Sequence, residues 1–208
     1  MVKPPLSARL TAALLVGLTK LISGAQARWQ GCEPSPRQRV YFANHSSHLD
    51  FTVLWSSLPP ELRWRTRPVA AKDYWLAGPL RRYLAQSVFR PILIERGGPN
   101  AREAFEQILD GLGTEQSLIL FPEGTRSLDG AVAPFKSGLY RLSRSRPDLE
   151  LVPVLLENLN RILPKGETLP VPLLSSATFG APLAAAPGET KAAFLERARQ
   201  AVLNLRQA

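Results

Sequence analysis

The segment 117–127 reads SLILFPEGTRS, an apolar run that changes abruptly into a polar loop. The run predicts a buried strand, and the loop follows at the point where the strand ends. The segment 40–50 repeats this arrangement, because the strand-like VYFA continues into NHSSHLD. In α/β domains the loops at the carboxyl ends of the strands form the ligand site. We therefore expect both loops to contribute to one site.

The same alternation of short apolar runs and longer amphipathic segments extends over the chain beyond Pro36. The predicted strands are 40–43, 67–71, 88–94, 117–121, 151–156 and 175–179. The predicted helices are 49–58, 78–84, 101–112, 136–145 and 190–205. A Pro-rich segment, 159–172, predicts a surface excursion. We therefore expect a single α/β domain in which helices flank a central sheet that is mostly parallel or mixed.

The composition is that of a globular protein. Of 208 residues, 45% are hydrophobic and 21% are charged, which excludes disorder, collagen and a coiled coil. A single cysteine, Cys32, permits no intramolecular disulfide and indicates a reducing compartment. One cysteine and two histidines cannot build a structural zinc site of Cys and His ligands, so no metal is expected.

The chain is strongly basic, with a net charge of +9 and a pI near 10.3, which favours an anionic partner. The segment 61–84 contributes six basic residues against two acidic ones, with Trp64, Tyr74, Trp75 and Tyr83 interleaved. Rings beside basic groups suit the headgroup region of an anionic membrane, and they also suit single-stranded nucleic acid. A solvated basic face with some rings in the core is the plainer alternative.

The N-terminal segment predicts an amphipathic helix. Leu10, Leu14, Leu18, Leu21 and Ala25 share one face, and basic charge lies on another. We interpret residues 1–29 as a helix that lies in a membrane interface and 30–208 as the main domain. The apolar stretch at 10–27 is predicted to be too short and too charged to span a bilayer, which needs roughly 20 predominantly apolar residues. A helix packed on its own domain and a signal peptide ending near Ala27 are the alternatives.

The loop after the first of these strands holds a histidine and a carboxylate. Ser47 is a plausible N-cap, which would fix Asp50 in the first turn of the next helix. One imidazole nitrogen of His45 would then bond Asp50, leaving the other as a general base. The alternative is that Asp50 only caps the helix. His45, His48 and Asp50 also resemble the start of a dinuclear metal site, but the chain has no third histidine.

The loop after the strand at 117–120 suits an anionic ligand. Arg126 offers a planar fork for phosphate, Gly124 admits a close backbone approach, and Thr125 and Ser127 add hydroxyl donors. Glu123 would bond a substrate hydroxyl or hold Arg126. The alternative is a structural Glu-Arg pair in a turn.

Together the two loops resemble the 1-acylglycerol-3-phosphate acyltransferase family of phospholipid biosynthesis. The matching blocks are Asn44-His45-x4-Asp50 and Phe121-Pro122-Glu123-Gly124-Thr125-Arg126. Between them, 92–96 (ILIER) looks like the family's second block, and 151–154 (LVPV) looks like its fourth. Four blocks in the expected order cover about residues 30 to 180.

The resemblance implies a glycerolipid acyltransferase-like fold and transfer of an acyl group from acyl-CoA or acyl carrier protein to lysophosphatidic acid, giving phosphatidic acid. It makes His45 the catalytic base and Asp50 its orienting partner. The acceptor site that it implies comprises Arg96, Glu123, Gly124, Thr125 and Arg126, to which we add Lys136 as an anion contact. No cofactor, metal or nucleic-acid partner is expected.

The resemblance also strengthens the membrane interpretation. It places the chain at the cytoplasmic face of the inner membrane, as a peripheral or monotopic protein. Three alternatives stay open: another acceptor, such as a lyso-ornithine lipid or a different lysophospholipid; a thioesterase or lipid hydrolase; and a non-catalytic basic protein that binds membranes or nucleic acid.

Overall fold

A computed structural model describes residues 4–95, 101–127, 129–159 and 174–206. Its centre is a seven-stranded sheet in the order β1-β7-β6-β2-β5-β3-β4. Neighbouring strands are parallel except β6 and β7, which are antiparallel, so the predicted mixed α/β sheet is confirmed. The strands are β1 (Gln26–Trp29), β2 (Arg39–Ala43), β3 (Thr66–Ala71), β4 (Ile92–Ile94), β5 (Ser117–Leu120), β6 (Glu150–Glu157) and β7 (Ser176–Phe179).

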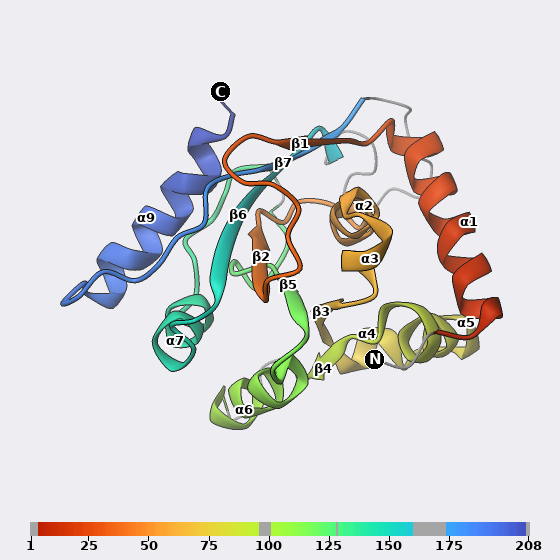
Figure 1. Ribbon diagram of the computed structural model, residues 1–208, viewed down its shortest axis with the longest axis horizontal. Coiled ribbons are helices and arrows are strands. Elements are labelled where there is room, and N and C mark those ends of the chain that lie inside the picture. The colour runs from red at the N-terminus through yellow and green to blue at the C-terminus, as the bar shows by residue number, and fades with distance from the viewer. Residues whose placement is uncertain (1–3, 96–100, 128, 160–173, 207–208) are drawn as a thin grey trace.

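Helices cover both faces of this sheet (Figure 1). On one face lie α1 (Leu6–Ser23), α2 (Asp50–Ser57), and the π-helical turn η1 (Leu84–Phe89), packed on one core. The short helices α3 (Pro60–Arg63), α4 (Lys72–Trp75) and α5 (Pro79–Tyr83) are close to them in the chain. On the opposite face lie α6 (Ala101–Leu112), α7 (Gly138–Ser145) and α9 (Lys191–Asn204).

The central strand β2 explains why both faces must be covered. All five of its residues are buried, and its side chains alternate between the two cores. Tyr41 and Ala43 join the core beneath α2, whereas Val40 and Phe42 join the core beneath α7 and α9. A strand that is apolar on both sides is typical of a parallel sheet enclosed by helices.

The register of β2 and β5 positions the site. Val40 lies opposite Leu118, and Phe42 lies opposite Leu120. Because the two strands are parallel and adjacent, the loops that follow them, at 44–49 and 121–127, emerge side by side at one edge of the sheet. Two loops far apart in the sequence therefore meet there.

The predicted strand 88–94 is wrong over its first half. Val88 and Phe89 end the π-helical turn η1, Arg90 follows with a positive φ of 48°, and only Ile92–Ile94 form a strand. Both apolar side chains are buried as predicted, but in a helix, because a short apolar run does not distinguish a buried strand from a buried helix. The predicted excursion at 159–172 lies outside the described residues apart from Leu159.

The sequence analysis missed β1. Gln26–Trp29 pairs in parallel with β7 at the sheet edge, so the sheet includes residues assigned to the N-terminal segment. Three of its four residues are exposed, and such a strand carries no apolar alternation for a sequence pattern to detect. The short helices α3 and α4 were missed for a similar reason, since four residues are too few to show a helical period.

Helix α1 has two different faces. Ala8, Ala12, Thr19 and Ser23 are buried against the domain. The opposite face carries a leucine stripe, defined as Leu6, Leu10, Leu14, Leu18 and Leu21, whose exposed fractions range from 47% to 80%. The helix thus packs on its own domain and also presents an apolar face to the surroundings.

The length of α1 corrects one prediction. The helix begins at Leu6, and its 18 residues are long and apolar enough to cross a membrane by length and composition alone. The sequence analysis began the apolar stretch at Leu10, after the start of the helix, and took its charges to exclude a span. Signal sequences and core helices satisfy the same criterion, and α1 is the one helix in the described ranges that does.

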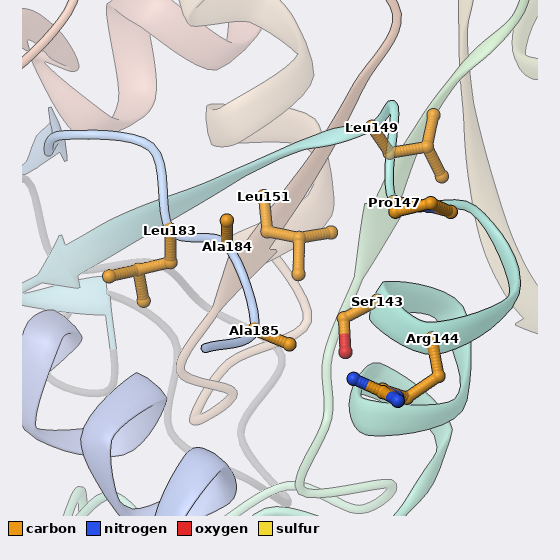
Figure 2. Close-up of a pocket in the computed structure, with 8 residues that line it drawn as sticks. All are labelled: Ser143, Arg144, Pro147, Leu149, Leu151, Leu183, Ala184 and Ala185. Atoms are coloured by element: carbon orange, nitrogen blue, oxygen red, sulfur yellow. The ribbon is translucent and has the colours of Figure 1, made fainter. Parts of the chain in front are cut away.

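A cavity of about 230 Å³ lies between α7, β6 and the segment at 183–185 (Figure 2). Leucine, alanine and proline side chains form most of its wall, and Ser143 and Arg144 of α7 complete it. A larger cavity, of about 380 Å³, lies where the loops after β2 and β5 meet.

Candidate active site

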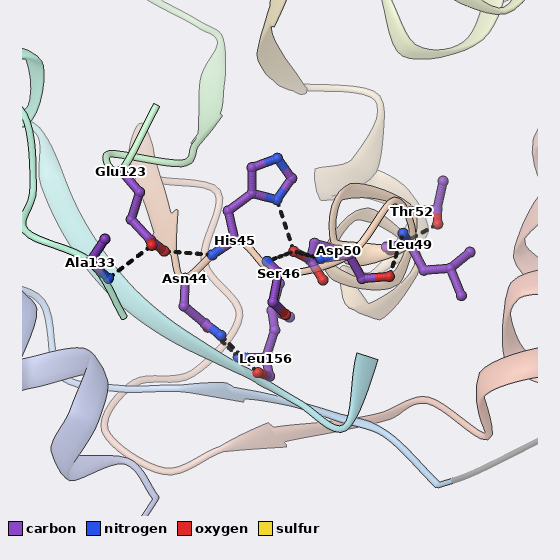
Figure 3. Close-up of polar contacts among 10 residues, drawn as sticks. Asn44, His45, Ser46, Leu49, Asp50, Thr52, Glu123, Ala133 and Leu156 are labelled. Carbon is purple, nitrogen blue, oxygen red and sulfur yellow. Dashed lines mark hydrogen bonds and ion pairs between the residues drawn. The ribbon is translucent and has the colours of Figure 1, made fainter. Parts of the chain in front are cut away.

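The centre of the site is a hydrogen-bonded histidine and aspartate (Figure 3). His45 Nδ1 lies 2.8 Å from Asp50 Oδ2, as the sequence predicted. The Asp50 side chain is completely buried, whereas the His45 side chain is 23% exposed. Only the imidazole of this pair can therefore meet a ligand.

The local backbone determines which nitrogen of His45 carries the proton. Asp50 Oδ2 also accepts the backbone N–H groups of Ser46, at 2.6 Å, and Ser47, at 2.8 Å. An oxygen that accepts two backbone N–H groups acts as an acceptor toward the ring as well, so Nδ1 of His45 donates to it. Nε2 is then the basic nitrogen, and it points away from Asp50 (Figure 3).

The predicted capping box is not formed. Helix α2 begins at Asp50 with Leu49 in the N-cap position, so Ser47 is not the N-cap. The Ser47 hydroxyl instead accepts the backbone N–H of Leu49 at 3.2 Å. The Asp50 carboxylate holds the turn from inside, because it accepts two backbone N–H groups that precede the helix.

Glu123 connects the two loops. Its side chain is 3% exposed, and its carboxylate accepts the backbone N–H of His45, at 2.7 Å, and of Ala133, at 2.9 Å. Burial raises the pKa of the Glu123 carboxyl, and these two N–H donors oppose the shift. The sequence predicted a contact with substrate or with Arg126, but both carboxylate oxygens of Glu123 bond backbone groups instead.

Other contacts fix the loop that carries His45. The carbonyl of His45 accepts the backbone N–H of Ser127 at 2.8 Å, and the imidazole stacks on Phe121 with the ring centroids 4.2 Å apart. The Asn44 carboxamide bonds both backbone groups of Leu156, donating at 2.9 Å and accepting at 2.8 Å. We did not predict this role, although a buried Asn at a strand end has to find such partners.

Both polar and apolar side chains line the cavity beside His45. The side chains of His48, Arg126 and Lys136 lie with His45 and Gly124 in its wall. Most of the remaining wall is apolar, namely Phe51, Pro68, Val69, Ala70, Ala71, Trp75, Ile94, Ile108, Leu120, Phe121, Pro122 and Leu139, and Thr52, Tyr74 and Gly138 complete it. This combination suits a ligand with an anionic group and an apolar chain.

Arg126 and Lys136 of the cavity wall form no ion pair with any residue that the structure describes. Arg126 Nη1 is buried and has no hydrogen-bond partner among the described residues. Lys136 lies directly over Gly124, since a Cβ atom on Gly124 would approach Lys136 Nζ to 2.6 Å. Gly124 also has a φ of 72°, so both its backbone and its lack of a side chain are required there.

The remaining predicted site residues lie in different places. Thr125 is exposed and is not part of the cavity wall. Lys136 precedes α7 rather than opening it, and its N–H donates to the Pro122 carbonyl at 2.8 Å. Arg96 lies outside the described residues. Among the described residues, no group of three His, Cys, Asp or Glu side chains could hold a metal ion.

A family model described as Acyltransferase matches residues 26–157, which is more than half of the chain. The chain belongs to the acyltransferase family. The family match begins at the first residue of β1 and includes both loops of the site.

Named relatives of this family member are 1-acyl-sn-glycerol-3-phosphate acyltransferases. The protein of that name from Limnanthes douglasii is 34% identical over 171 residues, covering 77% of this chain and 56% of its own. The alpha enzyme of Mus musculus is 28% identical over 159 residues, covering 74% of this chain and 53% of its own. The chain thus spans about half the length of the curated relatives it matches.

A solved structure supports the fold of this acyltransferase family member. The crystal structure of the 1-acyl-sn-glycerophosphate (LPA) acyltransferase PlsC from Thermotoga maritima matches with a TM-score of 0.71 at 19% identity. The match covers 96% of this chain and 80% of that one. At this level of identity the likeness describes the fold and not the substrate.

Proposed function

We propose that the protein transfers an acyl group from an acyl thioester, carried by CoA or acyl carrier protein, to the free hydroxyl of 1-acylglycerol-3-phosphate. The product is phosphatidic acid. The observation that carries this proposal is the His45–Asp50 pair, whose histidine lies in the wall of a cavity lined by basic and apolar side chains. The names of the relatives agree with this acceptor.

The mechanism follows from the tautomer of His45. Asp50 holds Nδ1–H, and Nε2 takes the proton of the acceptor hydroxyl as that oxygen attacks the thioester carbonyl. The tetrahedral intermediate collapses and expels the thiolate, which takes the proton back from His45. Asp50 stabilises the transient imidazolium, and the proposed route needs no acyl-enzyme.

In this proposal the headgroup of the acceptor lies beside the basic side chains of the cavity wall. Arg126 and Lys136 bind its phosphate, and Gly124 lets the headgroup approach the backbone. Thr125 and Arg96 remain proposed contacts. Glu123 contributes indirectly, because it fixes the backbone of His45. The apolar side chains of the cavity wall contact an acyl chain in this proposal.

The proposal also includes a membrane contact. The leucine stripe of α1 is exposed, and Thr11 of α1 shares a 3.0 Å hydrogen bond with Tyr83 of α5. Leu80 of α5 is 68% exposed beside the exposed Arg81 and Arg82. Exposed leucines next to arginines suit the interface of an anionic membrane, where the acceptor lipid resides. We place the protein at the cytoplasmic face of the inner membrane, peripheral or monotopic.

The central experiment measures acyl transfer from labelled acyl-CoA and labelled acyl carrier protein to a panel of lysolipids. The wild type should form phosphatidic acid from lysophosphatidic acid, and the His45→Ala variant should lose turnover while keeping its fold and its binding of lysolipid. If folded protein supplied with membrane forms no product with any lysolipid, the proposed acyltransferase activity is refuted.

The same panel separates the alternatives. Product with a lyso-ornithine lipid or another lysophospholipid, and none with lysophosphatidic acid, would reassign the acceptor. Release of free fatty acid without need of a lysolipid would indicate a thioesterase or lipid hydrolase. Vesicle binding that His45→Ala leaves intact, together with no turnover in the wild type, would indicate a non-catalytic membrane-binding protein.

The membrane contact has a separate test. The double variant Leu10→Glu and Leu14→Glu adds charge to two side chains that are 63% and 71% exposed, so it should fold normally. It should lose binding to vesicles containing anionic lipid. Ala192→Glu, on an exposed position of α9, is the matched control. Equal binding by both variants would exclude the leucine stripe as the membrane contact.

A further inference from the structure

His48 is a second histidine in the wall of the active-site cavity, and the mechanism proposed above does not use it. It lies in the loop after β2, two residues before Asp50, and is exposed. In the described part of the chain its ring has no hydrogen-bond or ion-pair partner. One ring nitrogen of His45 is bonded to Asp50, whereas both ring nitrogens of His48 are available to a ligand.

Positive charge surrounds this ring. Arg126, His45 and Arg81 are its basic neighbours, and Asp50 is the nearby carboxylate. Asp50 is already engaged by His45 Nδ1 and two backbone N–H groups. Burial, followed by the charge of Arg126, lowers the pKa of His48 below its ordinary value of 6.5.

Three donors that form no ion pair with a described residue thus line this cavity: His48, the buried Nη1 of Arg126, and Lys136 over Gly124. The charges of Arg126 and Lys136 attract an anion toward these donors. We infer that His48 is a specificity-determining residue that binds a phosphate monoester together with Arg126 and Lys136. This inference rests on the proposed function, which assigns the cavity to a phospholipid acceptor.

Protonation of His48 should be coupled to binding of the phosphate. A dianion beside the imidazole favours the charged ring, so it raises the pKa of His48, and the complex takes up a proton. Binding should therefore strengthen as the pH falls from about 8 toward 6.5, the ordinary value for histidine. Below about pH 6 the phosphate itself takes up a proton and the gain ends.

The kinetic test uses His48→Gln, which keeps a donor of similar size but cannot become charged. At pH 6.5 we expect the KM for lysophosphatidic acid to rise about tenfold with kcat within about threefold of the wild type. The pH dependence of KM should flatten. With a monoacylglycerol, which has no phosphate, the variant and the wild type should be alike. An unchanged KM for every phosphate-bearing substrate would overturn the inference.

A phosphate monoester also occurs in CoA, so the two sources must be separated. A rise in the KM for lysophosphatidic acid alone assigns His48 to the acceptor. A rise in the KM for acyl-CoA alone, with no change for acyl carrier protein, assigns it to the nucleotide phosphate of the donor. Either result supports a phosphate site at His48. Equal losses with the uncharged acceptor would show a merely structural role and would refute the site.

A second measurement is independent of turnover. The chain has two histidines, so the His45→Ala variant leaves the ring of His48 as its single imidazole for NMR titration. Glycerol 3-phosphate should raise the pKa of this ring, and glycerol at the same concentration should not. A shift without turnover by the wild type would contradict the proposed function alone. Turnover by the wild type with neither a pKa shift nor a KM effect would contradict this inference alone.

Discussion

Replacing Asp50 by asparagine isolates the charge of the buried carboxylate from its shape. The asparagine oxygen can still accept the backbone N–H groups of Ser46 and Ser47, so the turn before α2 should persist. The amide nitrogen would occupy the position of Asp50 Oδ1, which is buried and has no partner within the described residues. An unsatisfied amide there costs about 1–3 kcal/mol of stability, so folding must be checked.

The geometry sets the size of the catalytic effect. With His45 Nδ1 2.8 Å from Asp50 Oδ2, the two charge centres of an imidazolium and a carboxylate lie about 4 Å apart. At an effective dielectric constant of about 20, their attraction is about 4 kcal/mol. Asp50 is fully buried, so solvent does not screen it directly. Since about 1.4 kcal/mol corresponds to a factor of ten, loss of the charge should lower kcat about 10³-fold.

The assay compares kcat for acyl transfer to lysophosphatidic acid in the wild type, Asp50→Asn and a control. Asp110→Asn removes the same charge from an exposed position of α6 and should leave kcat unchanged. Thermal unfolding and lysolipid binding confirm that each variant is folded. A folded Asp50→Asn enzyme with kcat within about threefold of the wild type would refute the role of Asp50 as a charged partner of the base.

Three further predictions concern the fold and the cavity. Glu123→Gln leaves one of two buried N–H groups without its acceptor, so thermal unfolding should show a loss of about 1–3 kcal/mol together with lower kcat; full activity would contradict it. Hydrogen bonds from Arg197 hold the pKa of Glu189 at about 2, below its ordinary 4.5, so this pair stabilises the fold above pH 4.5 and the benefit disappears as the pH falls toward 2. Arg197→Gln should therefore lower Tm at pH 7 but much less at pH 2, and a loss independent of pH would contradict this. Ala70→Leu fills part of the apolar wall and should reduce turnover of long-chain donors by about tenfold relative to short ones, whereas equal losses would exclude a chain contact there.

The sequence predicted those parts of the site that depend on strand ends. The loops after β2 and β5 meet because both strands are parallel neighbours, and this follows from two apolar runs with polar loops behind them. The contact between His45 and Asp50 was predicted through a capping box that is not formed, because Asp50 is instead held by the backbone N–H groups of Ser46 and Ser47. The two-core arrangement likewise follows from strands that are apolar on both faces.

The parts that the sequence did not predict depend on distant partners. Glu123 was expected to face substrate, but whether it meets His45 or Arg126 is decided by how two loops pack, which no spacing encodes. Asn44 and Leu156 are similarly far apart in the chain. The edge strand β1 is specified by its pairing with β7 rather than by its own residues, and η1 shows that burial alone does not determine helix or strand.

The position of Glu123 has a consequence for how the site assembles. The carboxylate of Glu123, in the loop after β5, accepts one N–H from the segment that bears His45 and one from the segment that precedes α7, so displacement of Glu123 leaves both N–H groups without an acceptor. The segments that carry His45 and Ala133 should consequently open and close as one cooperative unit, so their two amides should show the same protection against hydrogen exchange. A state in which His45 is ordered while the loop at 121–127 is disordered should then be rare. The thioester should therefore seldom meet the base before the proposed phosphate-binding loop is ordered.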